Sequence, residues 1–330
     1  MTTTYTRSTF GKSNMFAPAL PSAWQRIQQD PILFIAQWLY AHRPLSTISQ
    51  PASTTSKSAS TIPVRVICIS DTHNEQPHVP NGDILIHAGD LTVNGTFEEL
   101  QLQLDWLNSL PHQHKVVIAG NHDLLLDQSF FRRNPRLASR ENDERRLRDL
   151  RWGSVVYLEN ELRVLNVRDR DVKVYGSPMT PKYGNWAFQY QAKDTWSNTV
   201  PEATDILVTH GPAKGHLDSS SANPSYLQGC AHLQRELWRV KPRLHVCGHI
   251  HSGRGVECSD WGWLQWDYDA VCCGEEGRVV VLRMLACWVW LWVLCMLGRA
   301  ANGRTMTSVN AAVVGEGLAE GEQTLLVDLR

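Results

Sequence analysis

The sequence predicts an α/β protein in which two β-sheets pack together and are flanked by helices. Short apolar runs rich in β-branched residues recur along the chain, and segments with apolar residues at helical spacing lie between them. A further group of strand-like runs in the middle of the chain predicts the second sheet. The length of 330 residues and the hydrophobic content of 42% are sufficient for a full core.

Charge and cysteine usage argue against two classes of protein. The formal net charge of −1 disfavours general nucleic-acid binding, which needs a basic surface to neutralise phosphates. The cysteines form no C-x-x-C pair, and Cys68 and Cys247 lie in apolar strand-like runs. The chain opens without a signal-peptide pattern. We therefore expect an intracellular protein, cytoplasmic or peripherally associated with a membrane, rather than a secreted one.

Residues 1–62 are expected to form an N-terminal extension, in which Asp30 is the only acidic residue. Residues 31–42 are a short apolar patch, and Asp30 followed by Pro31 is a helix-start signal. The patch is too short to span a bilayer, so it either docks on the folded domain of the same chain or lies in a membrane interface. The Ser/Thr-rich residues 46–61 predict a flexible linker.

The folded domain is expected over residues 63–330, and it opens with three strands that each end in polar residues. The strands are predicted at residues 64–69, 83–87 and 115–119. Their ends carry the motifs Ser70-Asp71-Thr72-His73, Ala88-Gly89-Asp90 and Gly120-Asn121-His122-Asp123. A capping box of Thr96 and Glu99 predicts a helix between the second and third strands.

The same pattern returns in the second half of the chain. Short strands of a second sheet are predicted at residues 155–157, 162–166 and 172–175. Two later strands, residues 205–208 and 244–247, end in Thr209-His210-Gly211-Pro212 and Gly248-His249-Ile250-His251. A helix is expected between them at about residues 230–240.

Five strand ends therefore deliver Asp, Asn or His side chains. Ligands of open α/β sheets bind at the carboxyl ends of the strands, so we expect these side chains to lie close together. A mixed set of nitrogen and oxygen donors suits Mn, Fe or Zn. Two other residues are candidates for contact with a substrate: His216, which follows the Gly211-Pro212 turn, and Arg254, whose guanidinium could bind a phosphate oxygen.

Two further histidines are expected to be structural. His87 and His245 lie in the middle of predicted strands, where a histidine is more often a hydrogen-bonded core residue than a ligand.

The series of strand-end motifs, in this order, resembles the calcineurin-like metallophosphoesterase family. The motifs are Asp71-x-His73, Gly89-Asp90, Gly120-Asn121-His122-Asp123, Thr209-His210-Gly211-Pro212 and Gly248-His249-x-His251. Residues 68–73 and Tyr175-Gly176-Ser177-Pro178 resemble its metallophosphoesterase domain-containing (MPPED-type) branch. The resemblance covers about residues 63–255 and resumes at the C-terminus. It implies an α/β fold (α+β, four-layer), a two-sheet metallophosphoesterase sandwich flanked by helices, with an apolar helical insertion near the C-terminus.

The resemblance also implies a site with two divalent transition-metal ions, with Mn²⁺ favoured over Fe or Zn. Asp71, His73 and His251 would hold the first ion. Asn121, His210 and His249 would hold the second, and Asp90 would bridge both. A hydroxide that bridges the metals would attack phosphorus. His122 would act as the acid, and Asp123 would fix its tautomer.

The function that follows from this resemblance is hydrolysis of a phosphodiester or phosphomonoester bond in a small substrate, with the diester favoured. The alternative is a membrane-associated binding or scaffold protein that has this fold and little turnover.

Residues 256–304 are expected to form an apolar, Trp-rich insertion. Within it, residues 279–297 carry Arg283 as their only charge and are long enough to be a candidate membrane span. Residues 307–312 and 324–328 resemble the closing strands of the family, and a single crossing would separate them from the site. We therefore expect a helix that lies in a membrane interface or packs on the domain, beside residues 31–42.

Overall fold

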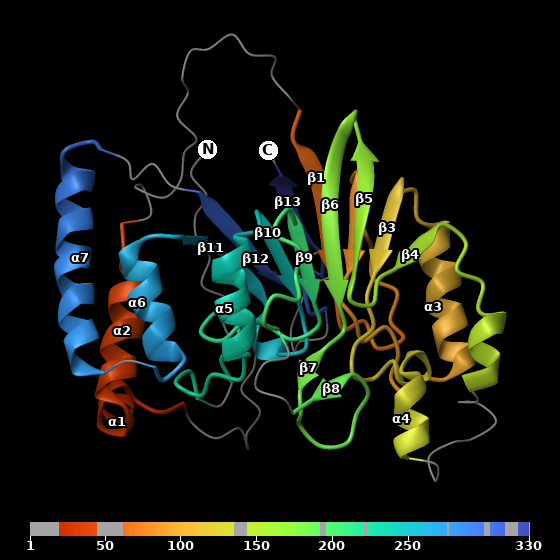
Figure 1. Ribbon diagram of the computed structural model, residues 1–330, viewed down its shortest axis with the longest axis horizontal. Coiled ribbons are helices and arrows are strands. Elements are labelled where there is room, and N and C mark those ends of the chain that lie inside the picture. The colour runs from red at the N-terminus through yellow and green to blue at the C-terminus, as the bar shows by residue number, and fades with distance from the viewer. Residues whose placement is uncertain are drawn as a thin grey trace.

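A computed structural model of the chain describes residues 20–44, 62–134, 144–191, 196–220, 223–275, 277–299, 304–313 and 323–329. Two β-sheets face each other in the centre of the molecule, and helices cover their outer faces (Figure 1). The predicted α/β sandwich is therefore confirmed. The predicted linker at residues 46–61 lies outside the described residues.

The first sheet has the strand order β13-β1-β2-β3-β4. Its strands are β1 (Val64–Ile69), β2 (Ile84–His87), β3 (His114–Val117), β4 (Val155–Tyr157) and β13 (Leu325–Leu329). Strands β1 to β4 are parallel, and β13 closes one edge by pairing antiparallel with β1. The assignment of residues 155–157 to the second sheet was wrong, because Val155 pairs with Lys115 of β3.

The second sheet has the strand order β11-β12-β10-β9-β6-β5. Its strands are β5 (Glu161–Val167), β6 (Arg170–Ser177), β9 (Ile206–Thr209), β10 (Leu244–Cys247), β11 (Gly255–Asp260) and β12 (Thr305–Asn310). The four central strands are parallel, and β5 and β11 are antiparallel at the two edges. The short strands β7 (Thr180–Pro181) and β8 (Gln189–Tyr190) form a separate pair.

Side chains alternate between the two faces of each strand, and those that face the other sheet form the core between the sheets. In β1, Val64, Val66 and Cys68 point into the inter-sheet core, whereas Ile67 and Ile69 pack on the outer face. Helix α3 (Phe97–Ser109) covers that outer face, and the capping box of Thr96 and Glu99 starts it as predicted. Helix α5 (Ala231–Val240) covers the second sheet on the other side (Figure 1).

Shorter helical segments complete this part of the fold. They are η2 (Leu124–Leu126), α4 (Gln128–Arg133), η4 (Glu144–Asp149) and η5 (His251–Gly253).

A group of helices forms a further layer beyond α5. It comprises α1 (Ala23–Gln29), α2 (Pro31–Ala41), α6 (Trp263–Cys272) and α7 (Arg278–Met296). Helices α6 and α7 lie between the adjacent strands β11 and β12 in the chain, so the apolar helix is an excursion from one sheet edge. The boundary expected at residue 256 was too early, because residues 255–260 are strand β11.

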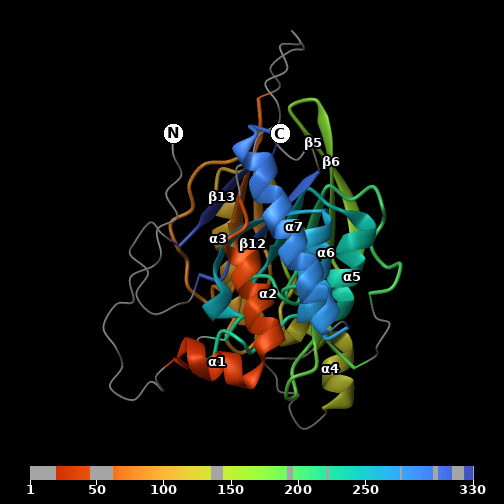
Figure 2. The same ribbon diagram turned by 90° about the vertical axis from the view of Figure 1, so that its left-hand side faces the viewer.

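Helix α2 docks on the same chain. The Asp30 carboxylate accepts from the Leu33 amide at 2.9 Å, and Pro31 occupies the first turn, as the start signal predicted. Its buried residues Leu33 and Leu39 share one apolar cluster with α6 and α7. Figure 2 shows α2 and α7 side by side on this flank of the molecule.

Candidate metal centre

The carboxyl ends of the parallel strands from both sheets meet along one edge of the sandwich. This edge carries the predicted ligands: Asp71 and His73 after β1, Asp90 after β2, Asn121 after β3, His210 after β9, and His249 and His251 after β10. The backbone closes this edge across the sheets through a parallel bridge between Ser70 and Ala312.

Four of these residues have a left-handed backbone. The φ angles of Asp71, His73, Asp90 and His249 are 55°, 43°, 54° and 65°. For a non-glycine residue this conformation costs about 1–2 kcal/mol. Such strain usually persists at functional sites, where the surrounding structure imposes the geometry.

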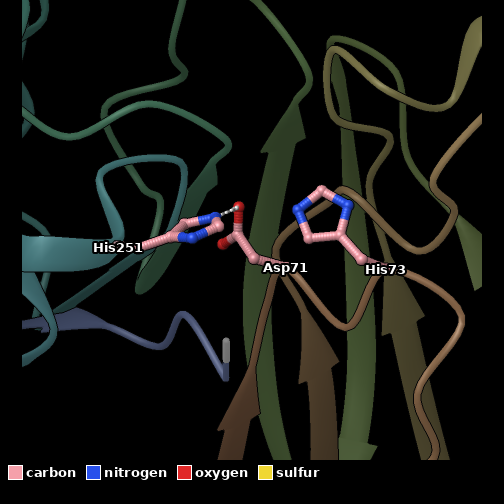
Figure 3. A group of neighbouring side chains, drawn as sticks. All are labelled: Asp71, His73 and His251. Atoms are coloured by element: carbon pink, nitrogen blue, oxygen red, sulfur yellow. Dashed lines mark ion pairs between the residues drawn. The ribbon is translucent and has the colours of Figure 1, made fainter. Parts of the chain in front are cut away.

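The first group of candidate ligands is Asp71, His73 and His251. Their ligand atoms all lie within 4.8 Å of one another. Figure 3 shows the two imidazoles on opposite sides of the Asp71 carboxylate, and His251 Nε2 lies 3.3 Å from Asp71 Oδ1. The structure thus brings together the three residues predicted to hold the first ion.

The second group is Asp90, His210 and His249, again with ligand atoms within 4.8 Å of one another. The Asn121 Oδ1 atom lies 3.1 Å from His210 Nε2, so the predicted amide ligand reaches the same place. Asp90 Oδ2 lies 3.3 Å from His210 Nε2 and 3.8 Å from His73 Nε2. Asp90 therefore contacts members of both groups.

Backbone carbonyls orient two of the imidazoles. His73 Nδ1 donates to the Thr92 carbonyl at 3.1 Å, and His210 Nδ1 donates to the Ala88 carbonyl at 2.9 Å. These hydrogen bonds fix the tautomer and leave Nε2 directed at the carboxylates. This is the usual arrangement for histidines that ligate a metal.

The electrostatics of the site fit a cation. Burial opposes ionisation of Asp90, but the adjacent His210 outweighs burial and holds the pKa of Asp90 below its usual range. Burial also opposes ionisation of Asp71, but the hydrogen bond from His251 and the charges of His210 and His251 together outweigh it and lower the pKa of Asp71. Burial lowers the pKa of His249 to about 4, so its imidazole is neutral near pH 7. The charges of Asp90 and Asp71 outweigh burial and raise the pKa of His210 to about 9, and a hydrogen bond to Asp71 raises the pKa of His251. Divalent metals bind ionised carboxylates and neutral imidazoles, so an ion that binds here would displace the protons of these two histidines.

Close backbone approach also shapes the site. A Cβ atom on Gly248 would lie 2.0 Å from Ser70 Oγ and 2.1 Å from Asp71 Oδ2. The absence of a side chain there lets the His249 amide donate to both Asp71 oxygens, at 3.0 and 3.1 Å. Only glycine can occupy this position without displacing Asp71.

His122 lies at the rim of the site and is half-buried. Its ring centroid is 4.9 Å from that of His73, and its amide donates to Asp90 Oδ1 at 2.8 Å. Trp186 packs on the imidazole with a centroid distance of 4.3 Å. His122 Nδ1 donates to the Val93 carbonyl at 2.8 Å.

The expected contact between Asp123 and the His122 ring is therefore wrong, because Val93 takes the position assigned to Asp123. The Asp123 carboxylate points into the core and accepts from the amides of Gly120, Leu91 and Thr92 at 2.8–3.2 Å. Burial, together with the charge of Asp90, raises the pKa of Asp123 to about 6.

His216 is not a substrate contact. Its side chain is 3% exposed, and both ring nitrogens bond to carboxylates, Nδ1 to Glu257 at 3.1 Å and Nε2 to Asp269 at 2.8 Å. The turn after Gly211-Pro212 carries it beneath helices α2 and α6 rather than into the site. Arg254 is half-buried, and its Nη1 donates to the Ala312 carbonyl at 2.6 Å. Its contact with a phosphate stays a prediction.

His87 and His245 are buried, hydrogen-bonded core residues, as predicted. His87 Nε2 bonds to Thr72 Oγ1 at 2.9 Å, and His245 Nε2 bonds to Thr209 Oγ1 at 2.8 Å. Burial lowers the pKa of each to about 3, so both are neutral core residues.

Sequence reasoning missed three contributors to the site. The carbonyl of Val93 and the hydroxyl of Thr92, which donates to Asp123 Oδ1 at 2.8 Å, lie in an ordinary loop segment with no motif. Trp186 lies in a loop that also contains Tyr183 and Phe188, and its contact with His122 depends on tertiary structure.

The chain is similar to several known proteins. A family model described as calcineurin-like phosphoesterase matches residues 64–253. The chain is 39% identical over 208 residues to human Metallophosphoesterase domain-containing protein 1, covering 58% of this chain and 62% of that protein. It is 34% identical over 232 residues to UPF0046 protein T07D4.2 of Caenorhabditis elegans, covering 63% and 56%. The resemblance to the MPPED-type branch is thereby confirmed.

A fungal relative matches more of the chain. Probable rhamnogalacturonate lyase C of Emericella nidulans is 42% identical over 299 residues, which covers 89% of this chain and 26% of that protein. The chain thus spans about a quarter of the fungal relative and less than two thirds of the human one.

Among solved structures, Phosphopantetheinyl Hydrolase (PptH) from Mycobacterium tuberculosis is similar with a TM-score of 0.39 and 18% identity, over 61% of this chain and 86% of that chain. The family match is more informative, since its residues run from the first strand of the first sheet to the segment that carries His251. They include both candidate metal groups, and we conclude that the chain belongs to the calcineurin-like phosphoesterase family.

Proposed function

We propose that this chain hydrolyses phosphate esters of a small substrate with the help of two divalent metal ions, and that it prefers phosphodiesters to phosphomonoesters. The observation that carries the proposal is the position of Asp90, whose Oδ2 lies near His210 of one candidate group and His73 of the other. A carboxylate shared by two groups is what a two-metal site requires.

The residues present fit such ions. Asp71, His73 and His251 would hold the first ion, and Asn121, His210 and His249 would hold the second, with Asp90 between them. This donor set of imidazole nitrogens and carboxylate or amide oxygens suits Mn²⁺, Fe or Zn²⁺, and we favour Mn²⁺. When bound, two such ions would neutralise charge on the phosphoryl group and would lower the pKa of a water molecule that attacks it.

In this proposal His122 handles the proton of the leaving group. Its Nδ1 is held by the Val93 carbonyl, so Nε2 is the nitrogen that exchanges a proton with the leaving oxygen. Trp186 packs on the ring and restricts its rotation. Asp123 contributes by holding the Gly120 and Thr92 backbones around the site rather than by touching His122.

Metal analysis of the purified protein tests the proposal. We expect close to two transition-metal ions per chain in the unaltered protein, and loss of both in Asp90→Ala, because Asp90 contacts both groups. Asp105→Ala is the matched control, since Asp105 is an exposed carboxylate on α3 that pairs with Arg151.

Hydrolysis by the metal-loaded protein of a panel of small phosphodiesters and phosphomonoesters measures the substrate preference. Full hydrolytic activity with one ion, or with none, would contradict the dinuclear site. Metal-loaded protein that turns over none of these esters would favour the alternative, a binding protein with this fold.

A further inference from the structure

Helix α7 exposes a continuous apolar surface along one side. We define the α7 face by its exposed large apolar residues, which are Val279, Leu282, Leu285, Val289, Trp290, Trp292, Val293, Met296 and Leu297. Most of these residues are three or four positions apart, so they form one stripe. The opposite stripe, which includes the buried Val280 and Met284, packs on α2 and α6. Contiguous apolar surfaces of this kind mark sites of interaction.

The α7 face lies on the outer flank of the molecule, in front of α2 and α6 (Figure 2). Trp38 of α2 is 46% exposed, and its ring centroid lies 5.9 Å from that of Trp288. Trp38 therefore extends the apolar surface beyond α7. Exposed tryptophans at the border of an apolar surface are typical of proteins that contact the headgroup region of a membrane.

Although α7 is long and apolar enough to cross a bilayer, the topology prevents it. Strands β11 and β12, which flank the excursion, are hydrogen-bonded neighbours, and Asp260 pairs with Thr305. The chain must return from Leu297 to Thr305, which fully extended spans at most roughly 29 Å. This length is no greater than the thickness of the hydrocarbon core, which is about 30 Å. If α7 crossed the bilayer once, the segment after it would be too short to return across the membrane and rejoin the sheet. Helix α7 therefore lies on the same side of the membrane as the two sheets.

The charges near α7 indicate which kind of partner the α7 face binds. Between residues 277 and 313 the chain carries Arg278, Arg283, Arg299 and Arg304 and no acidic residue. Two glutamates directly precede this segment, and the first of them, Glu275, pairs with Arg235 of α5. Arg283 pairs with Asp267 of α6, whereas Arg278 and Arg299 are exposed at the two ends of the helix. An apolar stripe with arginines at both ends is complementary to a surface of acyl chains and anionic headgroups.

A second copy of the chain is less suitable for the same surface. In a two-fold symmetric contact between two α7 faces, the arginine-bearing ends of the helices would meet other arginines. Glu275, three residues before Arg278, is already paired with Arg235, so these like charges would be poorly neutralised. Lipid phosphates would neutralise them.

We propose that the α7 face attaches this protein to the surface of anionic membranes, with α7 lying in the plane of the interface. The helix inserts its apolar stripe among the acyl chains near the headgroups, and the arginines bind lipid phosphates. The attachment is independent of the proposed hydrolysis.

Flotation of the full-length protein on a density gradient tests the proposal, because vesicle-bound protein floats whereas aggregates sink. We expect flotation with phosphatidylcholine vesicles that contain phosphatidylserine, and weaker flotation without it. The triple variant Leu285→Glu, Val289→Glu and Val293→Glu should lose binding by about tenfold or more, since it places carboxylates in the apolar stripe. Arg278→Gln with Arg299→Gln should remove the preference for phosphatidylserine.

The control variant is Leu102→Glu with Val164→Glu. Both residues are exposed and apolar, at 62% and 49%, but they lie on α3 and β5, away from α7 (Figure 1). This variant should float like the unaltered protein, and circular dichroism should show that all variants are folded.

Two results would overturn the proposal. One is unaltered protein that is monodisperse without detergent and does not float. The other is a triple variant that still floats. A stable dimer that the triple variant dissociates, without any flotation, would assign the α7 face to a second copy.

Discussion

His122 and Asp123 are neighbours in the chain but belong to different hydrogen-bond networks. The His122 side chain turns outward to Val93 and Trp186, whereas the Asp123 side chain turns into the core and holds three amides. A backbone carbonyl such as that of Val93 leaves no signature in a sequence, since every residue has one. The position of His122 could be predicted from its motif, but its partner could not.

The first prediction at this scale concerns His122. If His122 donates a proton as we propose, rather than ligating a metal, His122→Ala should keep its metal content and lower kcat by about 10²–10⁴-fold. The loss should be smaller for p-nitrophenyl esters, whose leaving group needs little protonation. Metal analysis and steady-state kinetics measure both effects.

The control for His122 is His78→Ala, since His78 is an exposed histidine outside the site. If His122→Ala lost its metals, His122 would instead be a ligand.

A second prediction concerns His245, which is buried and neutral because its pKa in the folded protein is about 3. In an unfolded chain the pKa of histidine is about 6.5. Between these values the unfolded state binds the extra proton, so the stability that His245 contributes is present above about pH 6.5 and is lost as the pH falls toward 3.

His245→Gln should therefore lose less stability than the unaltered protein on acidification. The two slopes should differ by up to about 1.4 kcal/mol per pH unit near pH 5. Urea unfolding of the metal-free proteins at several pH values measures the difference, and the exposed His78→Gln should follow the unaltered protein. Parallel curves for His245→Gln would show that His245 is not neutral in the fold.

At the scale of elements, predictions from local sequence patterns succeeded, whereas the prediction of long-range strand pairing did not. The capping box of α3 and the start of α2 depend on residues close in sequence, and the sequence predicts both correctly. The strands of the two sheets that carry the candidate ligands are also predicted, with ends that differ by no more than two residues from the observed ones, as for β3 and β9. The sheet to which β4 belongs depends on pairing with β3, about forty residues earlier, and the prediction of the sheet was wrong.

His216 is a second case in which a long-range contact could not be predicted from the sequence. Its distance in sequence from the Gly211-Pro212 turn suggested proximity to the site, but the carboxylates that bind it come from β11 and α6. These elements fold over it only in the tertiary structure, and the sequence contains no local signal of that contact.

At the scale of the molecule, the candidate metal site and the α7 face are separate parts of the structure, and β12 connects them. The Asn310 side-chain amide at the end of β12 donates to the Ile250 carbonyl at 2.9 Å, between the two predicted ligands His249 and His251. Strand β12 therefore supports the site directly. Helix α7 contacts α2 and α6, and it contributes none of the candidate ligands.

This separation leads to the last prediction. Replacing residues 278–299 with a Gly/Ser linker should preserve metal content and hydrolysis while abolishing flotation with anionic vesicles. The linker must leave β11, α6 and β12 in place, since β11 and α6 carry Glu257 and Asp269, the partners of His216. The variant should be less stable, because the buried side chains of Val280 and Met284 each contribute about 1.5–3 kcal/mol. A linker variant that folds but binds no metal would show that α7 supports the site, and a linker variant that still floats would place the membrane contact elsewhere.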